Sequence, residues 1–199
     1  MRAWLVLAVL ALSNVAWAEE PGWRVYDEKD GITYEVRSVP GSSFDEYRAS
    51  VTIPKTPQET LGAIWAAVTD KSPRKQMRST FIREQPDEVV VYQQISVPAI
   101  SDRDATFRIW KSPPANDGTV QVHFEAANDL GPPPNPKYVR LTQVQGSWQV
   151  APTPDGKTRL VYTSHSDPGG SVPAFITRGA QKDHMVVDVT GILKRLGLR

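Results

Sequence analysis

The sequence predicts an α+β fold in which a curved antiparallel β-sheet wraps around a long C-terminal α-helix and leaves an internal hydrophobic cavity. Several short segments alternate apolar and polar residues with a period of two, which is typical of half-buried strands. One helix-start motif interrupts them, and an apolar stripe with helical spacing closes the chain. A bent sheet can bury that stripe against its apolar face.

The first residues follow the order of a charged, an apolar and a small-residue region that is typical of a secretory signal peptide. Arg2 precedes an apolar run over residues 3–12, and small residues lead to Ala18. The run is shorter than the roughly 20 residues that cross a bilayer. We therefore expect a cleaved leader over residues 1–18, one domain over residues 19–199, and a periplasmic or secreted protein. An uncleaved N-terminal anchor is the alternative.

The composition excludes several classes of function. The full chain has 23 basic and 22 acidic residues, and removal of the leader takes away Arg2, which leaves equal numbers. We therefore expect no nucleic-acid partner. The chain contains no cysteine, which excludes disulfides, thiolate nucleophiles and cysteine metal sites. The mature length is enough for one core, and we expect a monomer.

The segments between leader and final helix are mostly strands. Residues 23–30 are interpreted as an amphipathic lead-in, and the proline-rich residues 131–136 as a stiff surface loop. Thr56-Pro57-Gln58-Glu59 is a capping box that predicts a helix ending near Asp70. The alternating segments predict strands over residues 32–37, 44–53, 89–97, 105–110, 119–126, 138–150 and 158–166.

The final helix is expected from about residue 172 to residue 196. Its apolar stripe consists of Met185, Val186, Val189, Ile192, Leu193 and Leu196. The small residues Gly179 and Ala180 lie on the same helix. They leave room for a ligand beneath it or allow it to pack closely on the sheet.

Short motifs along the mature chain occur in a characteristic order. They are Trp23, Asp30-Gly31-Ile32-Thr33-Tyr34, Asp70 with Arg74-Lys75-Gln76, Val89-Val90-Val91-Tyr92, Ser101-Asp102-Arg103-Asp104, Tyr138-Val139-Arg140, and Asp167-Pro168-Gly169-Gly170-Ser171-Val172-Pro173. In this order the chain resembles START domains, the lipid-transfer modules related to steroidogenic acute regulatory protein. The resemblance covers nearly the whole mature chain.

The resemblance implies a helix-grip fold and a tunnel between the C-terminal helix and the sheet. The tunnel would enclose one lipid or other hydrophobic small molecule, with transient membrane contact, no catalytic residue and no cofactor. The segment that follows residues 162–167 and the proline-rich loop are the expected gates. Burial of the ligand alone supplies a driving force of about 0.8 kcal/mol per methylene.

The sequence departs from two branches of that family. The positions that would cage a choline cation are Gln93, Ala105 and Val144, none of them aromatic. The buried acid and arginine of the sterol-binding branch would fall at Gln94 and Ile109. Arg74 resembles the arginine that meets lipid phosphate, so a cation there could neutralise an anionic head.

The candidate ligand-binding residues come from strand alternation, helical facing and the resemblance. The polar candidates are Arg74, Gln94, Arg103 and Asp183, and the candidates for the apolar wall are Phe107, Tyr162, Phe175, Ile176, Ala180 and Val186. Structural alternatives stand beside them. Arg103 and Arg140 could form ion pairs that tie loops, and His184 could face solvent.

A carrier that does no chemistry is the leading hypothesis. The sequence has no spacing of histidines and acids typical of a metal site, and no nucleophile, phosphate-loop or dinucleotide motif. An enzyme of the cyclase or hydrolase type is the alternative, with Asp183, His123 or Tyr162 as the available acid and base. A sensor or partner-binding domain with a closed cavity is the third possibility.

Overall fold

The computed structural model describes residues 22–98, 100–170, 172 and 174–199, and of residues 174–177 it describes the backbone alone. The leader predicted over residues 1–18 therefore lies outside the described residues. Neither helix of the described part has the length and apolar character needed to cross a bilayer.

The elements follow one another as the alternating pattern predicts, with strands on both sides of one short helix and a long helix at the end. They are β1 (Arg24–Lys29), β2 (Ile32–Ser38), β3 (Asp45–Ile53), α1 (Pro57–Val68), β4 (Met77–Gln85), β5 (Glu88–Ile95), β6 (Arg103–Lys111), β7 (Val120–Ala126), the 3₁₀ turn η1 (Asn128–Leu130), β8 (Val139–Arg140), β9 (Val144–Pro152), β10 (Thr158–Ser166) and α2 (Ala174–Arg195).

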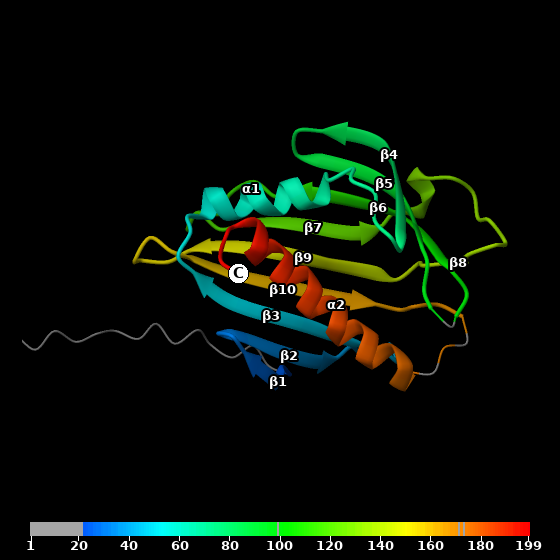
Figure 1. Ribbon diagram of the computed structural model, residues 1–199, viewed down its shortest axis with the longest axis horizontal. Helices are drawn as coiled ribbons and strands as arrows, with labels where there is room; N and C mark the ends of the chain where they lie inside the picture. The colour runs from blue at the N-terminus through cyan, green and yellow to red at the C-terminus, as the bar shows by residue number, and fades with distance from the viewer. Residues whose placement is uncertain (1–21, 99, 171, 173) are drawn as a thin grey trace, which may run out of the picture.

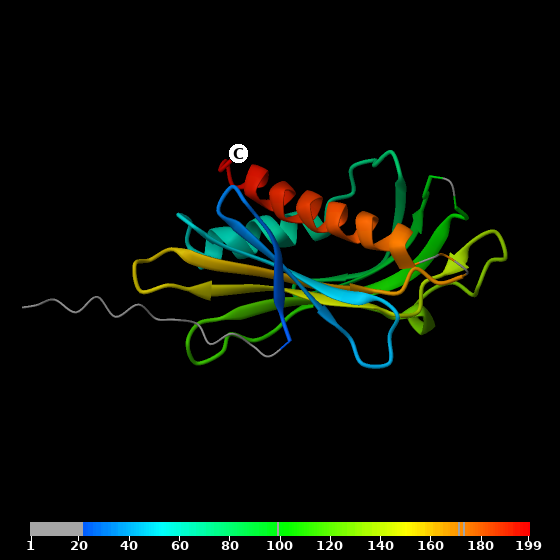
Figure 2. The ribbon, with the colours of Figure 1, turned by 90° about the horizontal axis from the view of Figure 1, so that it is seen from below.

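The strands form a single curved sheet in the order β1-β2-β3-β10-β9-β7-β6-β5-β4, and the short β8 pairs with β6 (Figure 1). All pairs are antiparallel except β6–β8. Both helices lie on the same side of this sheet (Figure 2). The predicted architecture of a curved antiparallel sheet with a long C-terminal helix is therefore confirmed.

The side of the sheet that carries the helices is called the helix face, and the opposite side the outer face. Cross-strand partners point to the same side. Tyr34, Ala49, Tyr162, Trp148 and Val122 are neighbours in one such row on the helix face, and all are buried. The hydrophobic core therefore lies between this face and the helices.

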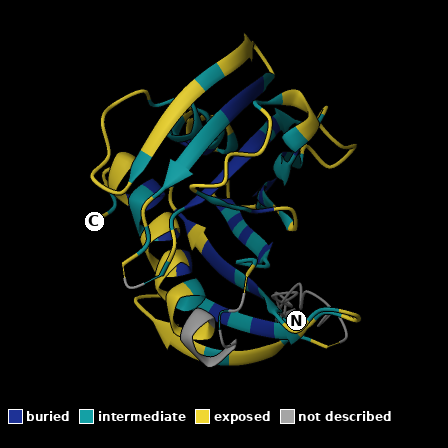
Figure 3. Ribbon diagram, turned by 90° about the vertical axis from the view of Figure 1, so that its right-hand side faces the viewer, coloured by how far each residue is buried: buried dark blue, intermediate teal, exposed yellow. Residues whose placement is uncertain are grey.

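The two helices are attached to the sheet in different ways. The capping box of α1 is confirmed: Thr56 accepts from the Glu59 backbone N–H, and the Glu59 side chain accepts from the Thr56 N–H. In α2, Met185, Val189 and Ile192 are buried with Leu193 and Leu196. The sheet contacts of α2 are with β3 and β10, and α1 packs on β7 and β9 (Figure 3 shows the burial).

Three elements differ from the prediction. Residues 23–30 contain strand β1, and β4 was not predicted at all. In both β1 and β4 a register shift interrupts the alternation of apolar and polar residues that predicts a strand. In addition, nearly all of β4 is exposed at the edge of the sheet. The strand predicted over residues 138–150 is two strands, because Leu141 N–H bonds back to the Asp104 carbonyl and the chain then turns into β9.

The proline-rich loop is fastened to the outer face. Arg140 pairs with the buried Asp104 through Nε (2.7 Å) and Nη2 (2.8 Å), and the Tyr92 hydroxyl donates to the same carboxylate at 2.8 Å. Arg140 also donates to the carbonyls of Pro132 and Pro133, at 3.2 Å each. The predicted role of this segment as a flexible gate is therefore wrong, because a buried ion pair holds it.

Replacement of Arg140 by methionine tests this fastening. The Arg140 guanidinium holds the pKa of Asp104 below its usual value, so the folded state relies on the carboxylate being paired. Removing one partner of a buried pair costs about 3–5 kcal/mol, whereas an exposed pair contributes up to about 1 kcal/mol. We expect urea unfolding to show the larger loss for Arg140→Met and the smaller one for Arg83→Met, which breaks the exposed pair with Glu88. Equal losses would contradict the assignment.

Candidate ligand-binding site beneath the C-terminal helix

The helix face carries an aromatic wall next to α2. Tyr162 of β10 stacks on Trp148 of β9, with ring centroids 4.0 Å apart and an angle of 14° between the ring planes. The ring centroid of Phe124 lies 6.1 Å from that of Tyr162. Trp148 and Tyr162 are buried, while Phe124 is half-buried. Other half-buried apolar side chains continue this wall towards β4 and β5: Phe81, Ile95 and Val144.

One acidic side chain of α2 reaches this wall. The Tyr162 hydroxyl donates to Asp188 Oδ2 at 2.9 Å. Asp188 is exposed to solvent, yet the surrounding protein desolvates its carboxylate enough to raise its pKa. The hydrogen bond of the Tyr162–Asp188 pair joins α2 to the sheet. The position of this pair, between α2 and the sheet, is called the recess below.

The groups around Asp188 oppose the effect of desolvation on its pKa. The hydrogen bond from Tyr162 and the positive charges of His184 and Arg74 lower the pKa of Asp188, but burial outweighs them. Burial and the neighbouring Asp188 charge raise the pKa of Tyr162 well above its usual value, so this hydroxyl stays protonated and acts as a donor. The pair is a donor and an acceptor joined on an otherwise apolar face.

Sequence reasoning missed Asp188. It lies seven residues after Gln181 and seven before Arg195, which places the three side chains on one side of α2, next to the apolar stripe. Gln181 donates to the Ser166 carbonyl at 2.6 Å, and Arg195 pairs with Asp70. Gln181, Asp188 and Arg195 thus form a polar line along one flank of the apolar stripe, with a spacing of two helical turns. This pattern is visible in the sequence and could have identified Asp188 as a site residue.

Three predicted site residues lie on the helix face or close to Asp188. Tyr162 and Phe107 are buried on that face. The positive charge of Arg74 lowers the pKa of Asp188. Arg74 itself is exposed and donates to the Ala67 carbonyl at the end of α1. Tyr162 therefore contacts Asp188 directly, whereas Arg74 acts on Asp188 through its charge alone.

Arg103 is buried at the first position of β6. Its guanidinium hydrogen-bonds backbone carbonyls in place of the ion pair considered for it. Its guanidinium donates to the carbonyls of Pro168 (3.2 Å), Gly169 (3.5 Å) and Ser101. The side chain thus ties β6 to the segment that leads into α2. That segment is the second gate expected from the sequence.

Gln94 lies away from the other candidates. It pairs with Asp104 across β5 and β6, and its amide lies 3.5 Å from the Tyr92 hydroxyl on the outer face. Ile109 points to the helix face, so the expected juxtaposition of Gln94 and Ile109 is wrong. Strand alternation separates them, since one residue of register moves a side chain to the other face.

The α2 candidates mostly point outward. Ala180, Asp183 and Val186 are exposed. For Ala180 and Asp183, rotation of 100° per residue carries the side chains away from Met185 and Val189, so these two do not face the sheet. Val186 lies at the border of the stripe, one helical heptad before the buried Leu193. The alternative for His184, an exposed position, is confirmed. The side chains of the remaining candidates lie outside the described residues: Phe175 and Ile176.

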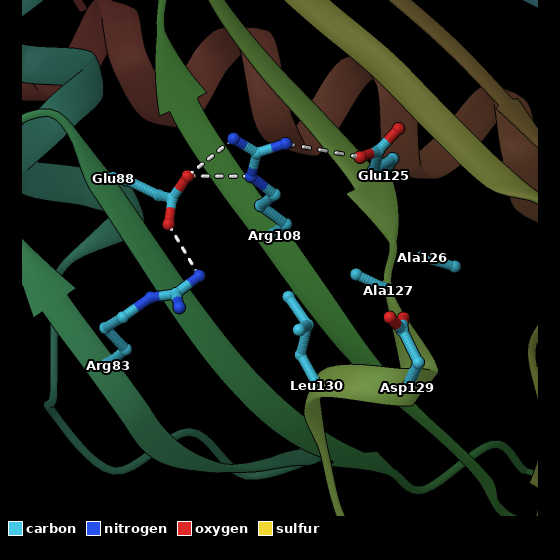
Figure 4. Close-up of a pocket in the computed structure, with 8 residues that line it drawn as sticks. All are labelled: Arg83, Glu88, Arg108, Glu125, Ala126, Ala127, Asp129 and Leu130. Carbon is cyan, nitrogen blue, oxygen red and sulfur yellow. Dashed lines mark hydrogen bonds and ion pairs between the residues drawn. The ribbon is translucent and has the colours of Figure 1, made fainter.

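Two hollows lie elsewhere on the described surface. One of about 660 Å³ is on the outer face, where Arg83, Glu88, Arg108 and Glu125 form a ladder of ion pairs, with α2 behind the strands (Figure 4). Another of about 300 Å³ lies between β1–β3 and α2, beside Tyr26. The charges of the first are largely paired with each other.

No group of three histidine, aspartate and glutamate side chains within residues 22–98, 100–170, 172 and 174–199 is arranged to hold a metal ion. His123, named as a possible catalytic group, lies on the outer face and stacks on Trp110, with ring centroids 5.1 Å apart. His165 is buried and its Nε2 lies 3.1 Å from the Ser42 hydroxyl.

Comparison with known proteins gives consistent results. The family model described as "START domain" matches residues 8–198. An uncharacterised protein of Pseudomonas aeruginosa is 26% identical over 193 residues, which cover 94% of this chain and 92% of that protein.

Solved structures show the same fold. A STAR-related lipid transfer protein of Xanthomonas axonopodis is 24% identical, with a TM-score of 0.64 over 89% of this chain and 94% of that one. Human StAR-related lipid transfer protein 5 is 21% identical, with a TM-score of 0.71 over 89% and 88% of the two chains.

The recess makes stability depend on pH through Asp188. Because its pKa is raised in the folded state, its favourable contribution is present below the unfolded pKa and is lost as the pH rises through the folded pKa. Asp188→Asn keeps an oxygen for Tyr162 and removes the charge. We expect it to raise the thermal midpoint at neutral pH, and the gain to vanish in acid. Asp183→Asn, on the outer side of α2, is the matched control, and an equal gain there would contradict the argument.

Proposed function

Because the chain belongs to the START domain family, we propose that it holds one lipid or other hydrophobic small molecule beneath α2 and does no chemistry on it. The observation that carries the proposal is the accessible but desolvated Asp188 beside the aromatic wall of Trp148 and Tyr162. An apolar ligand body gains about 0.8 kcal/mol per buried methylene against such a wall, and the polar pair orients one polar group.

The fold supports carriage of lipid. The similar structures from Xanthomonas axonopodis and human are named lipid transfer proteins, and their helix and sheet are arranged as in this chain. We propose the same class of ligand here, bound by a monomer that contacts a membrane transiently while it loads or unloads.

The enzyme alternative has little support in the geometry. It needs an acid and a base that converge on one point. His123 is on the outer face, Asp183 is exposed on α2, and of the three residues considered only Tyr162 faces the recess. Tyr162 and Asp188 already share one hydrogen bond, which suits the orientation of a ligand.

Val144→Trp tests the binding proposal. Val144 is half-buried on the helix face, so an indole there should fill the apolar end of the recess. Native mass spectrometry of the purified and lipid-incubated protein should show one bound lipid per monomer, and the variant should lose it at an unchanged thermal midpoint. Val187→Trp, on the exposed side of α2, should keep it.

Two results would overturn the proposal. One is a wild-type protein that holds no lipid after purification or incubation, which would favour a closed sensor domain. The other is conversion of the bound molecule to product, with turnover lost in Asp188→Asn, which would favour an enzyme.

We also propose export to the periplasm or beyond, which Arg2, the apolar residues 3–12 and Ala18 support. Mass measurement of the exported protein should give a chain that begins at Glu19. Ala18→Phe should block cleavage, because signal peptidases require small residues before the cut, and Ala11→Leu in the apolar run should not. A full-length chain that stays in the cytoplasm would refute export.

A further inference from the structure

A positively charged hollow lies between the first strands of the sheet and α2. It has a volume of about 300 Å³ and is called the basic hollow below. Three of its lining residues are cations, Arg24 on β1 and Arg178 and Lys182 on α2, and one is an acid, Asp45 at the start of β3. Its lining side chains therefore carry two more positive charges than negative ones.

The fold brings these cations together from two elements. Arg24 pairs with Val36 of β2, and Val36 pairs with Tyr47 of β3, so the three side chains form one row across the strands. Arg178 and Lys182 are four residues apart, which places them one above the other on α2, about 6 Å apart along the helix axis. Strand pairing and helical spacing thus direct the three cations to one hollow.

Two of the three cations have no acid to neutralise them. Arg178 Nε lies 3.6 Å from Asp45 Oδ2. The Lys182 ammonium instead lies over the ring of Tyr26, 4.5 Å from the ring centroid. Among the residues that the structure describes, neither Arg24 nor Lys182 forms an ion pair. Like charges around one hollow repel each other, and an anion between them would turn that repulsion into attraction.

The wall under Lys182 is aromatic and uncharged. The Tyr26 and Tyr47 rings meet edge to face, with centroids 5.9 Å apart. Burial raises the pKa of Tyr26, so its hydroxyl stays neutral. Asp27 and Asp183 act on Tyr26 through their charge, but neither of them lines the basic hollow. The half-buried Lys182 ammonium is therefore less screened than one in open water, which strengthens its attraction for an anion.

Charge and shape select the kind of anion. A phosphate monoester carries a charge of about −1.5 to −2 at pH 7 and has three acceptor oxygens, whereas a carboxylate carries one charge. The excess of two positive charges in the basic hollow matches the phosphate. Cations that surround a small concavity fit a single group, while a membrane surface is better contacted by cations that project from a convex face.

We infer that the basic hollow is a second binding site, which takes a small soluble molecule carrying a phosphate group and holds its oxygens with Arg24, Arg178 and Lys182. The bound phosphate joins β1 to α2 through charge. The site shares no lining residue with the Tyr162–Asp188 pair, so this inference does not rest on the proposed lipid binding.

Isothermal titration of the purified protein at constant ionic strength tests this site with three soluble probes: inorganic phosphate, phenyl phosphate and benzoate. Both phosphates should bind in a saturable way, one per monomer, and should raise the thermal midpoint because they bind only the folded state. Benzoate keeps the ring of phenyl phosphate but carries one charge, so it should bind more weakly than phenyl phosphate.

Variants assign the binding to the basic hollow. Arg24→Gln and Lys182→Gln should each weaken phosphate binding about tenfold, the effect of one hydrogen bond to a charged group, and Lys182→Arg should retain it. Asp45→Asn removes the one lining acid and should tighten binding, a gain that a disturbed fold would not produce. Lys194→Gln is the matched control, since Lys194 is an exposed cation of α2 that does not line the hollow.

Four results would overturn the inference. They are the absence of saturable phosphate binding, a loss in Lys194→Gln as large as that in Lys182→Gln, weaker binding in Asp45→Asn, and binding of phosphatidylglycerol vesicles without binding of either soluble phosphate. The last would assign these cations to a membrane surface. Lipid binding under α2 is measured separately, so its failure would leave the phosphate site intact.

Discussion

Burial of the apolar stripe of α2 is the constraint on which the rest of the structure depends. The stripe of Met185, Val189 and Ile192 must be kept from water, and it packs on β3 and β10 rather than across the whole sheet. The polar flank of α2 therefore meets β10, where Gln181 contacts Ser166 and Asp188 contacts Tyr162 of the aromatic wall.

The buried Arg103 and the half-buried Arg140 show how similar sequence signals lead to different structures. Arg140 is neutralised by Asp104 and holds a loop on the outer face, whereas Arg103 donates only to described backbone carbonyls and holds the segment before α2. Arg103 was a candidate for ligand contact, but its guanidinium is bound by backbone carbonyls of the chain. The polar groups of the proposed site therefore come from α2 and β10.

The parts of the fold that were predictable are those with local signals. The capping box at Thr56, the alternation around Tyr162 and the stripe of α2 each identify an element without reference to the rest of the chain. Strand β4 has no such pattern because its edge position leaves nearly all of it exposed. The site was harder to predict. Whether Gln94 faces the helix depends on strand register, and whether Asp188 is at a recess depends on packing.

The attachment of α2 is unequal at its two ends. Near its C-terminus, Ile192, Leu193 and Leu196 are buried. The ion pair of Arg195 with Asp70 joins this end to the segment after α1, and that of Arg199 with Asp30 joins it to the turn between β1 and β2. Residues 178–180 are exposed. Polar contacts hold α2 nearer its N-terminus, where Arg178 pairs with Asp45 and Gln181 donates to the Ser166 carbonyl. The two ends of α2 are thus fixed by different forces, apolar burial at one and charge and hydrogen bonding at the other.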